Sequence, residues 1–585
     1  MTVSTKVPDC SASSSGPDSS AETSINSRPN SSAAPRPGRL RIGRRYRANR
    51  LDGPYDAIVI GSGIGGLTTA AMLSSAGRKV LVLEQHYTAG GFTHAYDRNG
   101  YEWDVGVHYI GDVGDHPTMT RKLFDYLSAG QLQWAPMDST YDRICLGDEQ
   151  FDLRAGRDAF VDELVRCFPG ERAAIEAYLR RVNAVAAAMP LITAEKLLPR
   201  WCAPLTALWK KLRWPDWLNK TTYEVLRQVT DNEKLIAVLT GQWGDNGMTP
   251  GCGSFIIHAL IAKHYLYGGY YPVGGASKIA ETIIPQIQAG GGDVFTYAEA
   301  ETILLDGNHA RGVRMADGTE IAAPLVISGA GVFNTFEKLL PQSACERAGY
   351  HRDLQKVQPS MAHLCLYIGL QQTAETLGLP KTNYWLYPSA DYDGDMQKFL
   401  DDPEAEIPLV YLSFPSAKDP SFTQRYPGRA TIEIVAPGKY DWFARWHGEP
   451  WGKRGDDYEA LKERFTERLL EHLYKHFPQL RGKIDYCELS TPLSTDYFCR
   501  YSRGEIYGLD HDPSRFRQHW LRPKTRIKGL YLTGQDIMSC GVAGAMFAGL
   551  ATAQSILGIR RGLPLLRHIF RDKQKPGDKL HDVYS

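Results

Sequence analysis

A glycine-rich turn between an apolar run and a helical stretch constrains the fold of this 585-residue chain most. Residues 57–60 are apolar enough to form a buried parallel strand. The motif that follows at once contains four glycines: Gly61, Gly63, Gly65 and Gly66. In a strand–turn–helix unit such glycines permit a tight turn, let the backbone approach a pyrophosphate, and let helix and strand pack closely. A second apolar run, 79–83, ends at Glu84, where an acidic side chain can bind ribose hydroxyls. The segment predicts a dinucleotide-binding α/β unit. A glycine turn that only packs a helix on a sheet is the alternative.

The residues around and after Glu84 favour FAD over a nicotinamide nucleotide. Gln85 is followed by the pair Gly90-Gly91, a continuation typical of flavoenzymes in which the chain runs on beneath the flavin. No basic cluster stands at the strand end to bind a 2′-phosphate. We therefore expect Gln85, Gly90 and Gly91 to contribute to an FAD site.

Two later blocks have the pattern of the same domain. Residues 270–333 contain short alternating strands broken by turn residues at 306–308 and 317–318, which predict β-hairpins, and an apolar run at 325–328 predicts a returning strand. Val294 lies where backbone can bond an adenine.

The second of these blocks, 527–558, is another strand, glycine-rich turn and helix, and contains Gly534 and Asp536. Asp536 can accept a hydrogen bond from the ribityl chain. A helix beginning near Val542 and Ala543 can stabilise negative charge on a reduced flavin. A generic strand–helix junction is the alternative.

We therefore predict an α/β fold: a Rossmann-type FAD-binding domain with an inserted mixed α+β substrate domain. The expected organisation is a disordered Ser/Pro-rich, then Arg-rich tail (1–50), three FAD-binding parts (51–111, 270–333, 527–558), a helical substrate and membrane-docking region (112–269), a substrate domain (334–526), and a basic C-terminal tail (559–585). Helices are expected at 158–168, 172–189, 223–240 and 458–477, and strands at 407–414 and 430–436.

Composition limits the classes of partner, metal site and compartment that we expect for this chain. A net charge of +1 gives no general attraction to nucleic acid. The ten cysteines form no C-x-x-C pair and no metal-ligand spacing with histidine, so we expect no metal site and no disulfide framework. The amino end has no signal-peptide core, which predicts a cytoplasmic protein.

Two further patterns concern lipids. No run of about 20 consecutive apolar residues predicts a membrane span. The segment Trp201–Trp217 mixes four tryptophans with basic residues, a composition suited to peripheral docking at a membrane surface. The alternative is that these tryptophans belong to the core. The sequence does not determine the oligomeric state.

Several long segments without a general structural requirement carry a family resemblance. They are 84–86 with 89–91, 104–111, 241–246, 258–291, 331–335, 383–384, 414–420, 453–458, 507–511 and 531–545. Over nearly everything after residue 55 the chain resembles the carotenoid/retinoid oxidoreductases, and within them the branch that saturates a retinoid. Phe92 and Thr93 stand where that branch commonly has cysteines.

The resemblance implies addition of hydrogen across one carbon–carbon double bond of a polyene or isoprenoid substrate. FAD would be the cofactor, and NAD(P)H is one candidate electron donor. The expected proton donors are His108, Tyr109, Tyr271 and Glu505, with a structural role for each as the alternative. Redox-neutral carotenoid isomerases and desaturases share the flavin motifs, and Rab-escort-type proteins share the fold without the flavin chemistry. These readings stay open on the sequence.

Overall fold

The computed structural model describes residues 40–198, 202, 205–206 and 216–571, and every structural statement below concerns those residues. Most of the segment Trp201–Trp217 lies outside them. Trp217 is described, and its ring packs edge-on against Phe255 with 6.2 Å between centroids. This tryptophan contacts the helical core and is only partly exposed.

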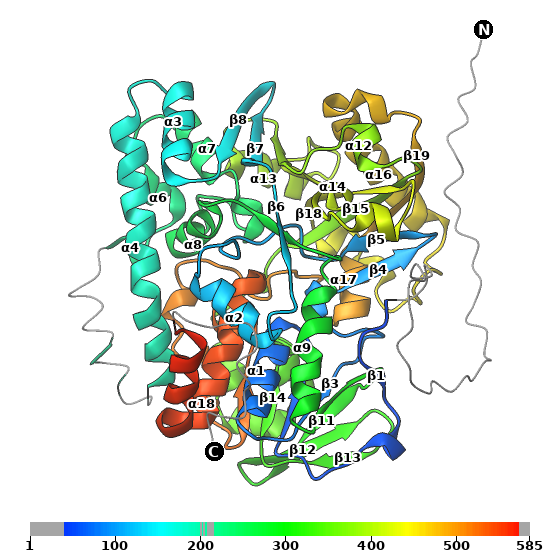
Figure 1. Cartoon of the computed structure of the whole chain (residues 1–585). Coiled ribbons are helices and arrows are strands. Elements are labelled where there is room, and N and C mark those ends of the chain that lie inside the picture. Colours follow the sequence, from blue (N-terminus) through cyan, green and yellow to red (C-terminus); the bar gives the residue numbers. More distant parts are fainter. Residues whose placement is uncertain (1–39, 199–201, 203–204, 207–215, 572–585) are drawn as a thin grey trace.

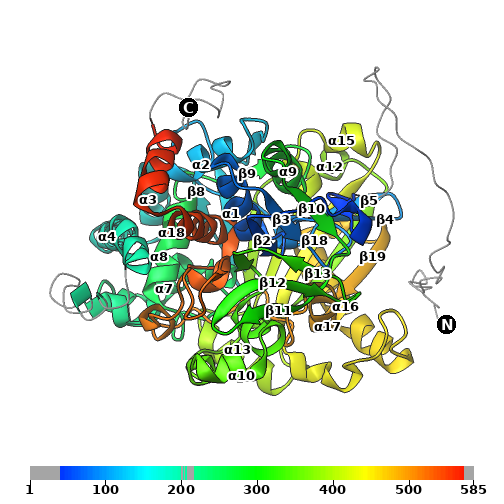
Figure 2. The ribbon, with the colours of Figure 1, turned by 90° about the horizontal axis from the view of Figure 1, so that it is seen from below.

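One of the two large sheets has six strands, all parallel (Figures 1 and 2). In spatial order its strands are β1 (Arg44–Arg45), β10 (Asp293–Thr296), β3 (Val80–Leu83), β2 (Ala57–Ile60), β14 (Val326–Ser328) and β20 (Leu530–Leu532). The strands come from distant parts of the chain, so the three blocks of the sequence assemble into one sheet.

Alternate residues of β2 face two different cores, as pleating requires. Ala57 and Val59 pack against helices α1 (Ile64–Ser75), α9 (Lys278–Ala289) and α18 (Gly541–Ile569). Ile58 and Ile60 pack on the opposite face against a three-stranded antiparallel sheet. The strands of that small sheet are β11 (Ala300–Asp306), β12 (His309–Met315) and β13 (Glu320–Ala322). The sequence prediction of hairpins here, and of a strand returning to the main sheet as β14, is confirmed.

The other large sheet has seven strands, both parallel and antiparallel (Figure 1). Its order is β19 (Ile484–Ser490), β15 (Ala362–Leu370), β18 (Ala430–Gly438), β17 (Val410–Ser413), β16 (Asn383–Tyr387), β7 (Thr140–Leu146) and β8 (Glu149–Arg154). Two hairpin-like pairs, β4 (Ala95–Arg98) with β5 (Tyr101–Asp104) and β6 (Trp134–Pro136) with β9 (Tyr270–Pro272), lie outside the two large sheets. The predicted α/β fold with a mixed substrate-domain sheet is confirmed.

Further helices flank the two sheets (Figure 1). They include α2 (Met119–Leu127), α3 (Arg157–Cys167), α4 (Arg172–Leu197), α8 (Phe255–Tyr265), α16 (Asp456–His476) and α17 (Pro492–Cys499). The single helix expected at 223–240 is two, α6 (Thr222–Leu226) and α7 (Glu233–Thr240), because Asn232 starts a new helix by accepting from Leu235 N through its side chain.

Part of the N-terminal tail that was predicted to be disordered is ordered, which corrects the sequence interpretation. Residues 44–45 form β1 on the edge of the parallel sheet, and Arg44 pairs with Asp293. At the other end α18 continues past 558 to Ile569, with a bend at Gly558 (φ +67°). By length and composition α18 would suffice to cross a bilayer, but half of its most apolar window is buried inside the protein. Such burial is also typical of a core helix in a soluble protein.

Candidate functional site

One large cavity of about 1560 Å³ lies between the carboxyl ends of the parallel strands and the seven-stranded sheet. Ligand pockets commonly measure about 300–1,000 Å³, so this cavity has room for a nucleotide and a further ligand. Its wall includes the motif glycines Gly61, Gly63, Gly65 and Gly66, and also Glu84, Gln85, Gly90 and Gly91. The position beyond the carboxyl ends of parallel strands is where open α/β sheets bind ligands.

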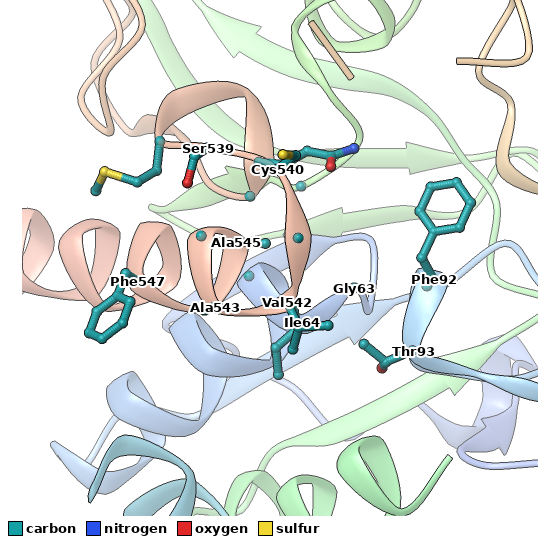
Figure 3. A pocket seen from close by; sticks show the side chains of 18 of the residues that line it. Gly63, Ile64, Phe92, Thr93, Ser539, Cys540, Val542, Ala543, Ala545 and Phe547 are labelled. Carbon is teal, nitrogen blue, oxygen red and sulfur yellow. The ribbon is translucent and has the colours of Figure 1, made fainter. Parts of the chain in front are cut away.

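The glycine turn presents bare backbone to the cavity. A Cβ atom built at Gly66 would lie 2.2 Å from Gly61 O, so only glycine allows the helix to pack this closely on the strand. At Gly63 no atom lies within 4 Å of such a Cβ, because this position faces the open cavity (Figure 3). Gly61 has φ +93°, a conformation that side chains disfavour.

The Glu84 carboxylate ties the turn to the end of β3. Ser62 donates to Glu84 Oε2 from its backbone N (2.9 Å) and from its hydroxyl (2.7 Å). His86 N donates to the other oxygen, Oε1, at 2.8 Å. The carboxylate is 8% exposed and lines the cavity, so its remaining acceptor capacity is available to a ligand.

Two further elements face the turn across the cavity (Figure 3). Val542 and Ala543, at the start of α18, lie beside the glycine turn, and the N-terminal end of this long helix favours negative charge. Phe92 and Thr93 approach from the short helix η2 (Gly91–Thr93), and the Phe92 ring is stacked on Tyr501 at 6.0 Å. Gly534, before α18, also lines the cavity.

Two expected cofactor contacts do not line the large cavity. The Val294 side chain is fully buried within β10, and the expected bond from its backbone to an adenine stays a prediction. Asp536 lies in a separate small pocket, where its Oδ2 accepts from Val332 N at 2.7 Å. Its Oδ1 is buried without a partner among the described residues, and burial raises the pKa of this carboxyl group.

The four expected proton donors separate into two pairs. His108 and Tyr109, on the loop after β5, line the cavity. Tyr271 is 2% exposed, does not reach the cavity, and donates to Asp104. Glu505 shares the small pocket of Asp536 and accepts from Arg503 N (2.9 Å). The structure does not bring Tyr271 and Glu505 to the cavity, because local hydrogen bonds hold both side chains behind its wall.

His108 contacts a buried carboxyl group that the sequence analysis missed. His108 Nδ1 lies 2.8 Å from Glu433 Oε2 on β18, and the Glu433 side chain has no exposed surface. Burial raises the pKa of Glu433, and burial next to Lys418 lowers the pKa of His108 to about 3. Glu433 had a sequence signal, because it is one acidic residue in the middle of an otherwise apolar strand, ATIEIVAPG.

Lys418 is a second missed residue, at the end of the short helix α14 (Pro415–Lys418). Its side chain is fully buried, and Nζ donates to His108 O (2.9 Å) and Ser413 Oγ (2.8 Å). A third bond goes to Asn383 Oδ1. Burial lowers the pKa of Lys418 to about 7.

A second hydrogen-bond network ends at Tyr109. Its hydroxyl donates to Asp142 Oδ2 at 2.8 Å and lies 3.2 Å from Asp245 Oδ2, while Gln242 donates to the same Asp142 oxygen at 2.7 Å. Burial, with the nearby Asp142 charge, raises the pKa of Asp245. The Tyr109 ring is stacked on Tyr265 with 4.0 Å between centroids. The wall around His108 and Tyr109 is therefore rigid and rich in buried carboxyl groups.

Away from the glycines the cavity is apolar and reaches the surface near three helix ends. Apolar side chains of α4 and α8 line this part, including Met189, Leu197, Leu260 and Ile261. Met119 of α2 and Phe570 after α18 line its outer end. This shape suits a long apolar ligand that enters between α4 and α18. Among the described residues no group of three His, Cys, Asp or Glu side chains is arranged to hold a metal ion.

Comparison with known proteins identifies relatives over most of the chain. Residues 59–127 match the NAD(P)-binding Rossmann-like domain family. The all-trans-retinol 13,14-reductase of Rattus norvegicus is 39% identical over 92% of this chain and 90% of the rat protein. A Danio rerio protein named inactive all-trans-retinol 13,14-reductase is 31% identical, over 92% and 91%. Prolycopene isomerase of Arabidopsis thaliana is 27% identical, over 86% and 82%.

Solved structures show the same fold at low sequence identity. An oxidoreductase from Methanosarcina mazei matches with TM-score 0.55 and 18% identity, over 85% of this chain and 99% of that one. Putrescine oxidase bound to putrescine matches with TM-score 0.56 and 16% identity, over 86% and 99%.

Proposed function

The chain belongs to the all-trans-retinol 13,14-reductase family, and we propose that it is an FAD-dependent oxidoreductase that saturates one carbon–carbon double bond of a retinoid or related polyene. The observation that carries this proposal is the single cavity, which joins a dinucleotide turn to an apolar channel and has His108 and Tyr109 in its wall.

The chain's residues fit FAD. Gly63 leaves open space in the cavity where a side chain would block a pyrophosphate, and Glu84 stands at the end of β3 with acceptor capacity for ribose hydroxyls. Val542 and Ala543 bring a helix N-terminus to the same cavity, where it would favour negative charge on a flavin ring. The chemistry that reduced FAD supplies when bound is transfer of a hydride equivalent to one carbon of the double bond.

The protein's own task is to align the polyene, exclude water and hold a proton at the second carbon. The apolar walls of α4 and α8 would align the chain, and His108 is the cavity residue best placed to hold the proton. NAD(P)H is the proposed source of electrons.

The test is turnover of all-trans-retinol by the reduced, flavin-loaded protein. Saturation shortens the conjugated system, so the absorbance should move to shorter wavelength and the product mass should rise by two hydrogens. An unchanged mass with an altered isomer composition would instead support the second candidate, a carotenoid cis–trans isomerase, which the 27% identity to prolycopene isomerase favours. The family also contains a protein named inactive, so turnover by the native chain is the decisive measurement. A colourless protein without flavin would contradict both.

We further propose that the protein docks peripherally on a membrane at the cavity opening. The ends of α4 and α18 lie side by side there (Figure 1). Large apolar side chains are exposed on or next to these helices and α2: Met119, Leu191, Leu197, Leu198, Leu205, Ile559 and Leu563. Arg560, Arg561 and Arg567 are exposed on the same end of α18. Apolar residues mixed with basic ones suit a lipid surface, and free cysteines suit a reducing compartment such as the cytoplasm.

A further inference from the structure

Two buried residues behind the cavity wall, Glu433 and Lys418, contact His108, which lies in the wall itself. Glu433 Oε2 meets His108 Nδ1 at 2.8 Å, and Lys418 Nζ donates to the backbone oxygen of the same histidine at 2.9 Å. Glu433 and Lys418 are 0% exposed, whereas the His108 side chain is 19% exposed and lines the cavity. Only the histidine can touch a ligand.

Asp104 and Glu433 are neighbouring buried carboxyl groups, and the hydrogen-bond donors around each indicate which of the two holds a proton. Asp104 accepts from Ala276 N (2.9 Å) and from the Tyr271 hydroxyl, so its carboxylate is well supplied with donors. Glu433 Oε1 accepts from Asp104 N at 2.8 Å, and Oε2 faces only the ring nitrogen of His108 among the described residues. Two buried carboxylates this close to each other cannot both ionise cheaply. This hydrogen-bond pattern favours a proton on Glu433 Oε2, from which it is donated to His108 Nδ1.

This arrangement fixes the tautomer of the histidine. If Nδ1 accepts from Glu433, the neutral ring carries its own proton on Nε2, the other ring nitrogen. Burial and the neighbouring Lys418 keep the ring neutral by lowering the pKa of His108. Tyr109 offers no equivalent proton, because its hydroxyl already donates to Asp142.

From this geometry we propose that His108 is the catalytic proton donor of the reduction and that Glu433 is the positioning residue that orients His108 and replaces its proton. The inference rests on the proposed reductase function. As His108 Nε2 releases its proton to one carbon of the broken π bond, Nδ1 takes the proton of Glu433 Oε2, and the other carbon receives the hydride equivalent from reduced FAD. The two electrons that the polyene gains would come from bound reduced FAD, which a reduced nicotinamide nucleotide would in turn reduce.

Lys418 compensates the charge that this transfer creates. After the proton leaves, Glu433 is a buried carboxylate, and the ammonium group of Lys418 is the cation that favours this ionised form. Solvent protons then restore Glu433 between turnovers. The titratable groups that face the pair are Asp104 on β5, Tyr271 on β9, His363, Cys365 and Tyr367 on β15, Tyr411 on β17, and Lys418 on α14.

The test compares native enzyme with E433Q and with the matched variant E488Q. Glu433 and Glu488 both lie opposite Tyr367, on the two strands that flank β15, but Glu488 pairs with Arg98 where Glu433 contacts His108. Flavin content and melting temperature verify that each variant is folded. In single turnovers with all-trans-retinol in D2O, E433Q should be about 10²–10⁴-fold slower than native with unchanged retinol affinity. E488Q should match native.

Two further readouts separate proton storage from a merely structural role. The native rate should fall as alkaline pH ionises Glu433, whereas the slow E433Q rate should lack that fall. In infrared spectra of the flavin-loaded protein without retinol, native and E488Q should share a protonated-carboxyl carbonyl band that is absent from E433Q. E433D should recover part of the rate, because it restores a carboxyl group.

Native-like turnover by E433Q, an unchanged pH profile or a retained band would each overturn the relay. If native enzyme bound flavin and retinol but gave no dihydro product, the reductase proposal would fall. The carbonyl band would still decide whether Glu433 holds the proton that it shares with His108.

Discussion

The six-stranded sheet presents bare backbone to the cavity, whereas the seven-stranded sheet and its neighbours place buried charge behind the wall. Around Gly63 and Gly66 the polypeptide is nearly featureless, and its contribution is close approach and N–H groups. Around His108, by contrast, Glu433, Lys418 and Asp142 are all 0% exposed. The difference teaches that the nucleotide side recognises a ligand by shape, while the other side is built to hold and move protons.

Glycine substitutions give the largest expected effects and separate packing from ligand binding on the nucleotide side. Gly66→Val should prevent stable folding, because its Cβ would lie 2.2 Å from Gly61 O. Gly63→Val should fold with a melting temperature near that of flavin-free native protein yet bind no FAD, because its side chain would occupy the cavity. Flavin absorbance after gel filtration, together with calorimetry, measures both. A yellow, fully active Gly63→Val protein would show that the turn does not hold the nucleotide.

Removing the buried cation should damage the other side. Lys418→Met leaves three buried acceptors, Asn383 Oδ1, His108 O and Ser413 Oγ, without their donor. We expect a loss of about 3 kcal/mol in the free energy of unfolding, with FAD retained by the protein that remains folded. Denaturant unfolding of the Lys418→Met and native proteins measures the loss. An unchanged stability would mean that the amine is neutral and weakly bonded.

Protonation of buried histidines at low pH should reduce their contribution to the free energy of unfolding on both sides of the cavity. Burial lowers the pKa of His86 beside the nucleotide turn to about 4, and that of His108 to about 3. The ordinary value for these side chains is 6.5. At these histidines the unfolded chain therefore binds more protons than the folded one below about pH 6.5, and their contribution to stability should fall as the pH drops from there towards 4. Glu433, whose pKa is raised, acts in the opposite sense, and its contribution is lost as the pH rises through that pKa.

Chemical unfolding at pH 7.5, 6 and 5 measures this dependence. The histidine contribution to the free energy of unfolding should decline towards pH 5 in the native protein. The decline should be smaller in a His258→Gln variant, because burial also lowers the pKa of His258 to about 4. Equal acid sensitivity in the two proteins would contradict the assignment for that side chain.

The smallest effect on stability is expected at the cavity opening. Ile559 is 84% exposed, so Ile559→Glu should change the free energy of unfolding by at most about 0.5 kcal/mol. The same substitution should weaken sedimentation with vesicles that contain anionic lipid. His309, exposed on β12 in the small sheet, offers a control position, and His309→Glu should leave vesicle binding unchanged. Equal binding by both variants would place the docking surface elsewhere.

The nucleotide side was predictable from sequence because its requirements are local. A tight turn, a close helix approach and an acidic strand end recur at fixed spacing, so Gly61, Gly66 and Glu84 could be placed in advance. The relay was not predictable, because Glu433 and His108 are 325 residues apart and meet only through sheet pairing. For a related reason the sequence could not show that Val294 and Asp536 do not line the large cavity. Whether a residue on a correctly predicted strand or turn faces the cavity depends on neighbours such as β1 that the motif does not specify.

The pairing of β1 with β10 has a practical consequence for shortened versions of the protein. Arg44 and Arg45 supply the outermost strand of the parallel sheet, opposite Phe295 and Thr296. A chain trimmed to begin at Leu51, the start of the first FAD-binding part predicted from the sequence, would leave β10 as an edge strand with unpaired N–H and C=O groups. Such borders recruit strands from other molecules. Trimmed protein should therefore self-associate, while a chain beginning near Leu40 should remain dispersed.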